Sequence, residues 1–153
     1  MDLVLFSILI TALVAGIHLA IVYRLFGIGA SWRECGWLVI VTLFGFFVER
    51  GFLYFNVLQH ESQTGAVWGI PLWLLFLWLI FATTLRFSLS FLRERFTWSI
   101  ALGAGAALSY WGGAALNSTS QLASPPWIAL FWIALVWALV LPTLVTFHKR
   151  YIA

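Results

Sequence analysis

Two neighbouring ionisable residues, Glu49 and Arg50, stand inside a strongly apolar stretch, FGFFVERGFLYF. A charged side chain at the centre of a bilayer costs about 2.5–3.5 kcal/mol on insertion scales, so it is usually paired or part of a functional site. Successive residues on a helix point about 100° apart, so these two side chains cannot share a face. Glu49 is therefore a candidate proton-relay or ligand-binding group inside a helical bundle. The alternative is a buried ion pair or hydrogen-bonded cluster that sets the register of the helices.

Other polar residues within apolar stretches belong to the same set of candidates. We expect His18 to be a hydrogen-bonded packing residue, with a ligand or proton carrier as the alternative. We expect Arg86 to extend toward the polar headgroups, with a contact to a headgroup phosphate as the alternative. The expected hydrogen-bond donors to Glu49 lie on other helices: Thr83, Thr84, Ser109, Tyr110 or an arginine.

Small side chains recur every four residues in the tract ALGAGAALSYWGG, at Ala101, Gly105, Ser109 and Gly113. Small residues let two helix backbones approach closely, which drives helix association in lipid. The stripe predicts packing within the chain, so that a leucine at position 105 or 109 would disrupt folding. Homodimerisation through the same face is the alternative.

Three tryptophans, Trp78, Trp132 and Trp137, lie deep within apolar stretches. Packing between helices is the expected role for them, and a lipid-facing groove is the alternative.

The sequence contains no pattern that specifies a reaction. Cys35 is the only cysteine, so an intramolecular disulfide is excluded. We find no paired-histidine motif, zinc-ligand spacing, phosphate loop or nucleophile elbow. We therefore predict no catalytic residue, no metal and no cofactor, and we do not expect an enzyme.

The composition indicates the elements that must position these residues. Of 153 residues, 63% are hydrophobic and 8% charged, whereas globular domains carry about 25% charged residues. A transmembrane helix needs about 20 mainly apolar residues. The sequence thus predicts a single all-α domain over residues 1–153, a membrane bundle of five transmembrane helices at about 3–23, 36–57, 70–91, 98–116 and 126–147. Ser31 and Glu34 match a capping box before the second helix.

The basic residues predict the orientation of this bundle. Five crossings place every basic residue of the loops and tail on one side, which is cytoplasmic by the positive-inside rule. The N-terminus is then outside and the C-terminus cytoplasmic, in what we expect to be a bacterial inner membrane. Although the net charge is +3, the dispersed basic residues argue against a nucleic-acid partner. The basic residues that carry this prediction are Arg24, Arg33, Arg93, Arg95, Lys149 and Arg150.

Four stretches carry a resemblance to a known family: WRE to GFFVE (32–49), WLLFLWLIFATTLRFSL (73–89), ALGAGAALSYWGGAAL (101–116) and ALVLP (138–142). Together they resemble a bacterial membrane-protein family catalogued as a domain of unknown function, number 2878. The chain departs from the family pattern at two positions. Arg50 follows the acid Glu49 where the family has a small residue, and Ala107 stands where the family usually has a proline. The resemblance implies a small inner-membrane protein without an assigned activity. The family's genes lie near those of fatty-acid-modifying enzymes, which implies a lipid-related accessory role.

Three functions remain open on this basis. The first is a non-catalytic accessory or scaffold protein, associated with membrane lipids, a membrane-protein partner or further copies of itself. The second is a small transporter or proton-coupled carrier that uses Glu49, Arg50 and His18. The third is a membrane enzyme acting on lipid. A water-filled cavity at Glu49 would favour transport, a lipid-lined groove would favour lipid handling, and a dry, satisfied cluster would favour a scaffold.

Overall fold

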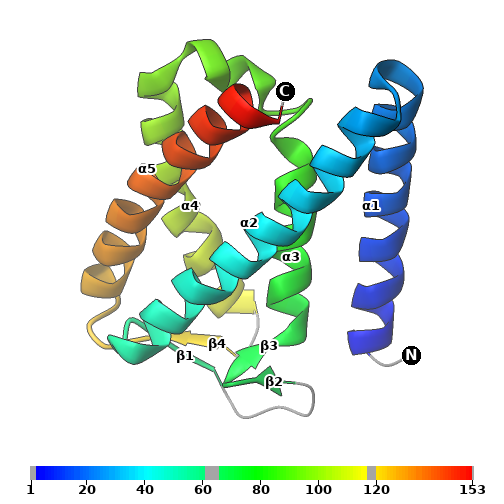
Figure 1. Cartoon of the computed structure of the whole chain (residues 1–153). Coiled ribbons are helices and arrows are strands. Elements are labelled where there is room, and N and C mark those ends of the chain that lie inside the picture. Colours follow the sequence, from blue (N-terminus) through cyan, green and yellow to red (C-terminus); the bar gives the residue numbers. More distant parts are fainter. Residues whose placement is uncertain (1–2, 61–65, 117–119, 153) are drawn as a thin grey trace.

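The computed structural model describes residues 3–60, 66–116 and 120–152, and this part of the chain is mostly helical (Figure 1). The apolar tracts form five α-helices joined by short connections, and a 3-10 helix, η1, follows the third. Their bounds are α1 Leu3–Phe26, α2 Ile28–Tyr54, α3 Leu72–Thr84, η1 Ser90–Glu94, α4 Phe96–Leu116 and α5 Pro126–Tyr151.

Two short antiparallel ribbons lie between the helices, and one of them takes in Ile70 and Pro71, which were predicted to begin the third helix. Strand β1 (Leu58–His60) pairs with β4 (Ser120–Leu122), and β2 (Ala66–Val67) pairs with β3 (Ile70–Pro71). The pairing satisfies backbone groups between helices. Figure 1 shows the strands together at one end of the molecule, here called the strand end, and the chain terminus at the other, here called the C-terminal end.

Three described helices are long and apolar enough to cross a membrane: Leu5–Phe26, Ile28–Tyr54 and Pro126–Tyr151. The first of them exposes a row of large apolar side chains, including Leu9, Leu13 and Ile17. An apolar surface of this extent is unfavourable in water, whereas lipid chains provide a matching solvent. These features indicate an integral membrane protein.

Helix α2 begins earlier than predicted, and the expected capping box is wrong. Only Gly27, with φ +85°, separates α1 from α2, a conformation that glycine adopts without steric cost. Ser31 therefore lies inside α2, and its hydroxyl donates to the Leu19 carbonyl at 3.4 Å. Glu34 is fully buried rather than at a helix start.

Helix α3 ends at Thr84, sooner than the predicted third helix, and side chains bond to backbone carbonyls around its end. The Thr84 hydroxyl donates to the Phe81 carbonyl at 2.6 Å, a local bond that competes with the helical pattern. Just beyond the helix, Arg93 Nη2 donates to the carbonyls of Leu85 and Arg86 at 3.3 and 3.0 Å. These bonds satisfy carbonyls that the ended helix leaves free.

The helices form two groups. Helices α1, α2 and α3 contact one another, and α4 packs against α5. The α4–α5 contact is close because Gly103 has no side chain: a Cβ there would lie 2.2 Å from the Trp137 carbonyl oxygen. Ser99 and Ala107, one turn on either side of Gly103, are buried on the same face.

The predicted packing stripe lies on a different face of α4. A Cβ added at Gly105 or Gly113 would meet no atom within 4 Å, and Ala101 and Ser109 are exposed. Packing within the chain through this stripe is therefore wrong. Two interleaved series of small residues share the same four-residue spacing, so the spacing does not distinguish the buried face from the exposed one.

Candidate functional site

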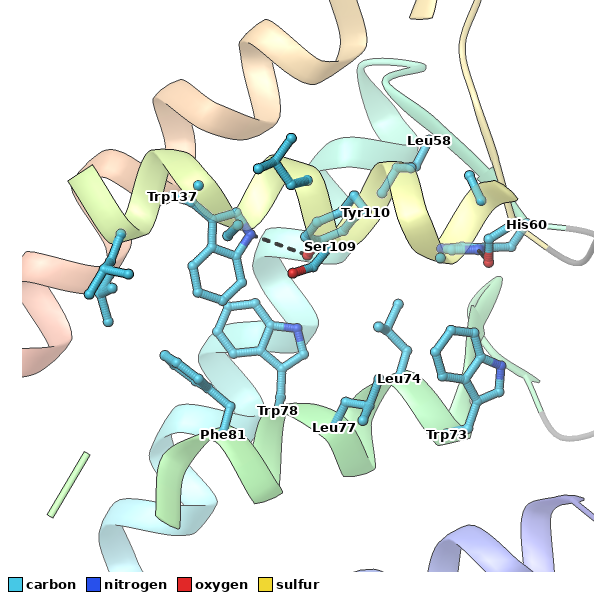
Figure 2. Close-up of a pocket in the computed structure, with 18 of the residues that line it drawn as sticks. Leu58, His60, Trp73, Leu74, Leu77, Trp78, Phe81, Ser109, Tyr110 and Trp137 are labelled. Atoms are coloured by element: carbon cyan, nitrogen blue, oxygen red, sulfur yellow. Dashed lines mark hydrogen bonds between the residues drawn. The ribbon is translucent and has the colours of Figure 1, made fainter. Parts of the chain in front are cut away.

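A cavity of about 670 Å³ lies between α3 and α4, and we call it the α3–α4 groove (Figure 2). Its walls are mainly apolar, with Leu74 and Phe81 from α3 and Leu102 from α4. Leu77 and Leu108 also line it and are 50% and 69% exposed. The groove therefore opens at the apolar surface between the two helices.

The strand end of the groove is lined by the polar side chains His60, Trp73 and Ser120, and Figure 2 shows His60 and Trp73 at the end remote from Phe81. His60 Nδ1 is hydrogen-bonded to Ser120 Oγ at 2.8 Å. His60 Nε2 and Trp73 Nε1 are buried and have no hydrogen-bond partner among the described residues. Burial lowers the pKa of His60, so its ring is neutral near pH 7.

Beside the groove, Glu49 of α2 is the centre of a polar cluster with side chains of α3, α4 and α5, which we call the Glu49 cluster. Its carboxylate is fully buried. Glu49 Oε1 accepts hydrogen bonds from Trp78 Nε1 of α3 at 3.0 Å and from the Tyr110 hydroxyl of α4 at 2.5 Å. Trp137 Nε1 of α5 donates to the Tyr110 oxygen at 3.3 Å (Figure 2). The cluster therefore connects the α1–α2–α3 group with the α4–α5 pair.

Sequence features of α2 and α5 explain this geometry. Gly45 lies one turn before Glu49, and a Cβ there would lie 2.1 Å from the Trp78 ring. The missing side chain lets the indole lie against α2 with its N–H directed at the carboxylate. The Trp78 and Trp137 rings stack at 4.8 Å with an 18° interplanar angle. Trp78, Tyr110 and Trp137 line the groove, so they separate Glu49 Oε1 from it.

The predicted surroundings of Glu49 agree with the structure in part. Its interior position and the bond from Tyr110 match the prediction, whereas the Trp78 donor was not foreseen. An indole N–H in the apolar tract of α3 is the signal that could have revealed it. Arg50 is exposed and donates to the Trp68 carbonyl at 3.2 Å, so it takes no part in the cluster.

The remaining candidates near the groove divide between two environments. Ser109 lines the groove and is exposed, without a described bond to Glu49. Trp78 and Trp137 combine both roles considered for the deep tryptophans, because they pack between helices and also line the groove. Trp132 is 49% exposed and lines a separate cavity beside the start of α5.

A second buried carboxylate, Glu34, forms an ionic cluster at the C-terminal end, which we call the Glu34 cluster. His18 Nε2 donates to Glu34 Oε1 at 2.9 Å, and Arg86 Nε donates to Oε2 at 2.7 Å. His148 Nε2 lies 3.6 Å from Oε2. Arg86 Nη2 also donates to the Ile152 carbonyl at 3.0 Å. The cluster therefore joins α1, α2, the residues after α3 and the end of α5.

The Glu34 cluster corrects one prediction and agrees with another. Arg86 is 7% exposed and paired with Glu34, so the expected extension toward the headgroups is wrong. His18 has the expected hydrogen-bonded packing position. Glu34 was missed as a site residue because it was assigned to a helix start. Glu34, Val41 and Gly45 share the buried face of α2 with Glu49, a helical spacing that could have identified it.

Among the residues that the structure describes, no group of three or more His, Cys, Asp or Glu side chains could hold a metal ion. Thr84 bonds to its own helix. The described residues thus form a largely apolar groove next to the Glu49 cluster, and a separate Glu34 cluster at the C-terminal end.

Comparison with curated proteins and with solved structures gives no significant match. The family model described as Protein of unknown function (DUF2878) matches residues 3–143. This match covers most of the chain, and the protein therefore belongs to that family of membrane proteins of unknown function.

Proposed function

We propose that the chain is a non-catalytic accessory protein of the bacterial inner membrane that binds a lipid in the α3–α4 groove. The observation that carries this proposal is the groove itself, an apolar cavity that opens between two helices at a lipid-compatible surface. Its volume of about 670 Å³ falls within the roughly 300–1,000 Å³ typical of small-molecule sites.

The chemistry of the groove favours an amphiphile with one long apolar chain. Leu74, Leu77 and Phe81 of α3 line the groove together with Leu102 and Leu108 of α4, which suits a hydrocarbon chain. The exposed Leu77 and Leu108 at the opening allow a bilayer lipid to enter without crossing water. A polar solute would leave these apolar walls without matching contacts.

The proposed orientation has five crossings, the N-terminus outside and the C-terminus cytoplasmic. The residues at the C-terminal end support it, because η1 and the end of α5 there bring Arg93 and Lys149 together. The start of α2 and the end of α1, which carry Arg33 and Arg24, lie at this same end (Figure 1). Basic residues are concentrated on the cytoplasmic side of membrane proteins. The strand end then faces outward.

A proton-coupled carrier is the second candidate, and the unpaired Glu49 oxygen favours it. Glu49 Oε2 is buried without a hydrogen-bond partner among the described residues. Buried intramembrane carboxylates mark proton or ion pathways in many transporters. Arg50 does not support this candidate, because it is exposed and bonds to a backbone carbonyl instead.

The proposed lipid binding is tested by purifying the chain in a mild detergent and identifying the lipids that remain bound. The test variant is Gly105→Phe, which places a ring in the groove at a position where an added Cβ meets no atom. The matched control is Gly112→Phe on the same helix, where an added Cβ also meets no atom but which is not a lining residue of the groove.

We expect the wild type and Gly112→Phe to retain the same lipid and Gly105→Phe to lose it. Equal amounts of bound lipid in all three proteins would overturn the proposal. Acidification of vesicles that depends on Glu49, with no retained lipid, would favour the carrier instead.

A further inference from the structure

The strand end of the α3–α4 groove has two polar atoms that the described fold leaves unsatisfied. His60 Nε2 and Trp73 Nε1 are both buried, and neither has a hydrogen-bond partner among the described residues. Both residues line the groove, and Figure 2 shows them at the same end of it. Buried polar groups are nearly always hydrogen-bonded, so two orphans in one cavity call for an external partner.

Both residues lie in regular elements at the strand end, and a side-chain hydrogen bond holds the His60 ring. His60 lies in β1 directly opposite Ser120 of β4, and the Ser120 hydroxyl contacts its Nδ1 at 2.8 Å. Trp73 lies in the first turn of α3, immediately after strand β3, which ends at Pro71. The position of the His60 ring is therefore set before any ligand arrives, as expected of a preorganised binding site, and Trp73 is placed beside the same end of the groove by the start of α3.

We infer that His60 and Trp73 form a headgroup site for the lipid of the groove, and that this headgroup is uncharged and carries a hydroxyl or carbonyl oxygen. The inference rests on the proposed function and adds the polarity and direction of the ligand. The headgroup lies at the strand end, and the hydrocarbon chain extends toward Phe81 and Leu102.

The hydrogen-bonding capacity of the two rings determines the kind of oxygen that fits. An indole N–H only donates, so the ligand must present an acceptor to Trp73. When the Ser120 hydroxyl donates to His60 Nδ1, the ring proton is on Nε2, which then donates; when Nδ1 donates to Ser120, Nε2 accepts instead. A carbonyl or hydroxyl oxygen can accept from the Trp73 N–H and from a protonated Nε2, and a hydroxyl can also donate to Nε2 when the proton is on Nδ1.

The absence of positive charge in this groove argues against an anionic headgroup. None of the residues that line the α3–α4 groove in the described part of the chain is Lys or Arg, and His60 is neutral because burial lowers its pKa. Burying a phosphate without a cationic partner is strongly unfavourable. A neutral amphiphile, such as a monoacylglycerol or a long-chain alcohol, meets the requirements.

The test measures the binding of three probes to the full chain in detergent by native mass spectrometry. The probes are monooleoylglycerol with a neutral headgroup, octadecene with none, and oleoyl lysophosphatidylglycerol with an anionic one. The variants are Trp73→Phe, which removes the N–H and keeps an aromatic ring, and His60→Leu. Trp111→Phe is the matched control, since Trp111 is 57% exposed and is not a groove-lining residue.

For the wild type and Trp111→Phe we expect monooleoylglycerol to bind more tightly than the other two probes. Each headgroup variant should weaken monooleoylglycerol binding on the order of tenfold, the size of about one hydrogen bond. Octadecene binding should stay unchanged, since it makes no polar contact.

Three results would overturn the headgroup site. The first is that Trp73→Phe weakens the binding of monooleoylglycerol and octadecene equally, and the second is that it weakens neither. The third is that the wild type binds the anionic lysolipid as tightly as the neutral lipid. Because Trp73→Phe conserves most of the side chain, the test does not depend on the folding of His60→Leu. A Gly105→Phe variant that binds all three probes like the wild type would instead contradict the proposed function.

Discussion

Glu34 and Glu49 are both fully buried in α2, and their partners differ in charge. Glu34 contacts a guanidinium and two imidazoles, so its cluster contains formal positive charge close to the carboxylate. Glu49 Oε1 receives only neutral donors, an indole N–H and a phenolic O–H. Removing the acid should therefore leave a buried cation in the first case and unpaired neutral donors in the second.

For the Glu49 cluster we predict that Glu49→Gln retains most of the stability and Glu49→Leu does not. Glutamine keeps an acceptor for Trp78 and Tyr110, whereas leucine leaves both donors unpaired at a cost of about 1–3 kcal/mol each. Thermal unfolding in detergent measures the difference, with Arg50→Gln as the control because Arg50 is exposed. Equal melting temperatures for the Gln and Leu variants would contradict the role of these bonds.

For the Glu34 cluster we predict a larger loss on Glu34→Leu, about 3–5 kcal/mol, because Arg86 remains buried without its carboxylate. Combining Glu34→Leu with Arg86→Met should recover part of this loss, since the unpaired charge is then gone. Glu94→Gln is the control, because Glu94 pairs with Lys149 at 2.7 Å on the exposed surface. A double variant no more stable than Glu34→Leu would argue against direct pairing.

Packing between elements can be tested on two glycines of α4. We predict that Gly103→Ala lowers the melting temperature, because its Cβ would lie 2.2 Å from the Trp137 carbonyl oxygen of α5. Gly105→Ala should be neutral or stabilising, since its Cβ meets no atom within 4 Å and alanine favours a helix over glycine by about 1 kcal/mol. A lower melting temperature for Gly105→Ala alone would place the close contact on the predicted stripe instead.

The connection between η1 and α5 should respond to pH. Lys149 lowers the pKa of Glu94 by a hydrogen bond and by its charge. The stabilisation from this pair is present above the ordinary glutamate pKa of about 4.5 and is lost as the pH falls through the lower folded-state value. We expect a small effect, because both groups are exposed. The melting temperature of the wild type should show a small decrease as the pH falls from 6 to 3 that Glu94→Gln lacks, and the two proteins should otherwise respond to pH in the same way.

The orientation of the whole molecule can be tested by cysteine labelling in a Cys35→Ser background. We predict that Trp68→Cys at the strand end is labelled from the outer side and Tyr151→Cys at the C-terminal end only after cytoplasmic access. Both positions are exposed, at 75% and 53%. Labelling of Tyr151→Cys by an impermeant reagent in intact cells would reverse the proposed topology.

Dimerisation through the exposed stripe of α4 stays a prediction, and crosslinking through Ser109→Cys would detect it.

The sequence alone determined the membrane class of the protein, the approximate positions of its helices and the interior position of Glu49. Each of these follows from a free-energy cost that depends on the residue types within one segment of the sequence. Lipid requires long apolar helices, and a carboxylate within such a helix must find a partner. The Tyr110 donor could be anticipated because few polar groups lie at a similar depth.

Only the tertiary structure decided which face of α4 is buried, which ion pairs form and where the groove lies. Two series of small residues with the same spacing occur in α4, and contact with α5 selects the one that contains Gly103. Arg86 and Glu34 are 52 residues apart in the chain, so no local pattern joins them. The groove exists because α3 packs with α1 and α2 while α4 packs with α5. That division depends on how the helices associate in three dimensions, which their separate apolar patterns do not specify.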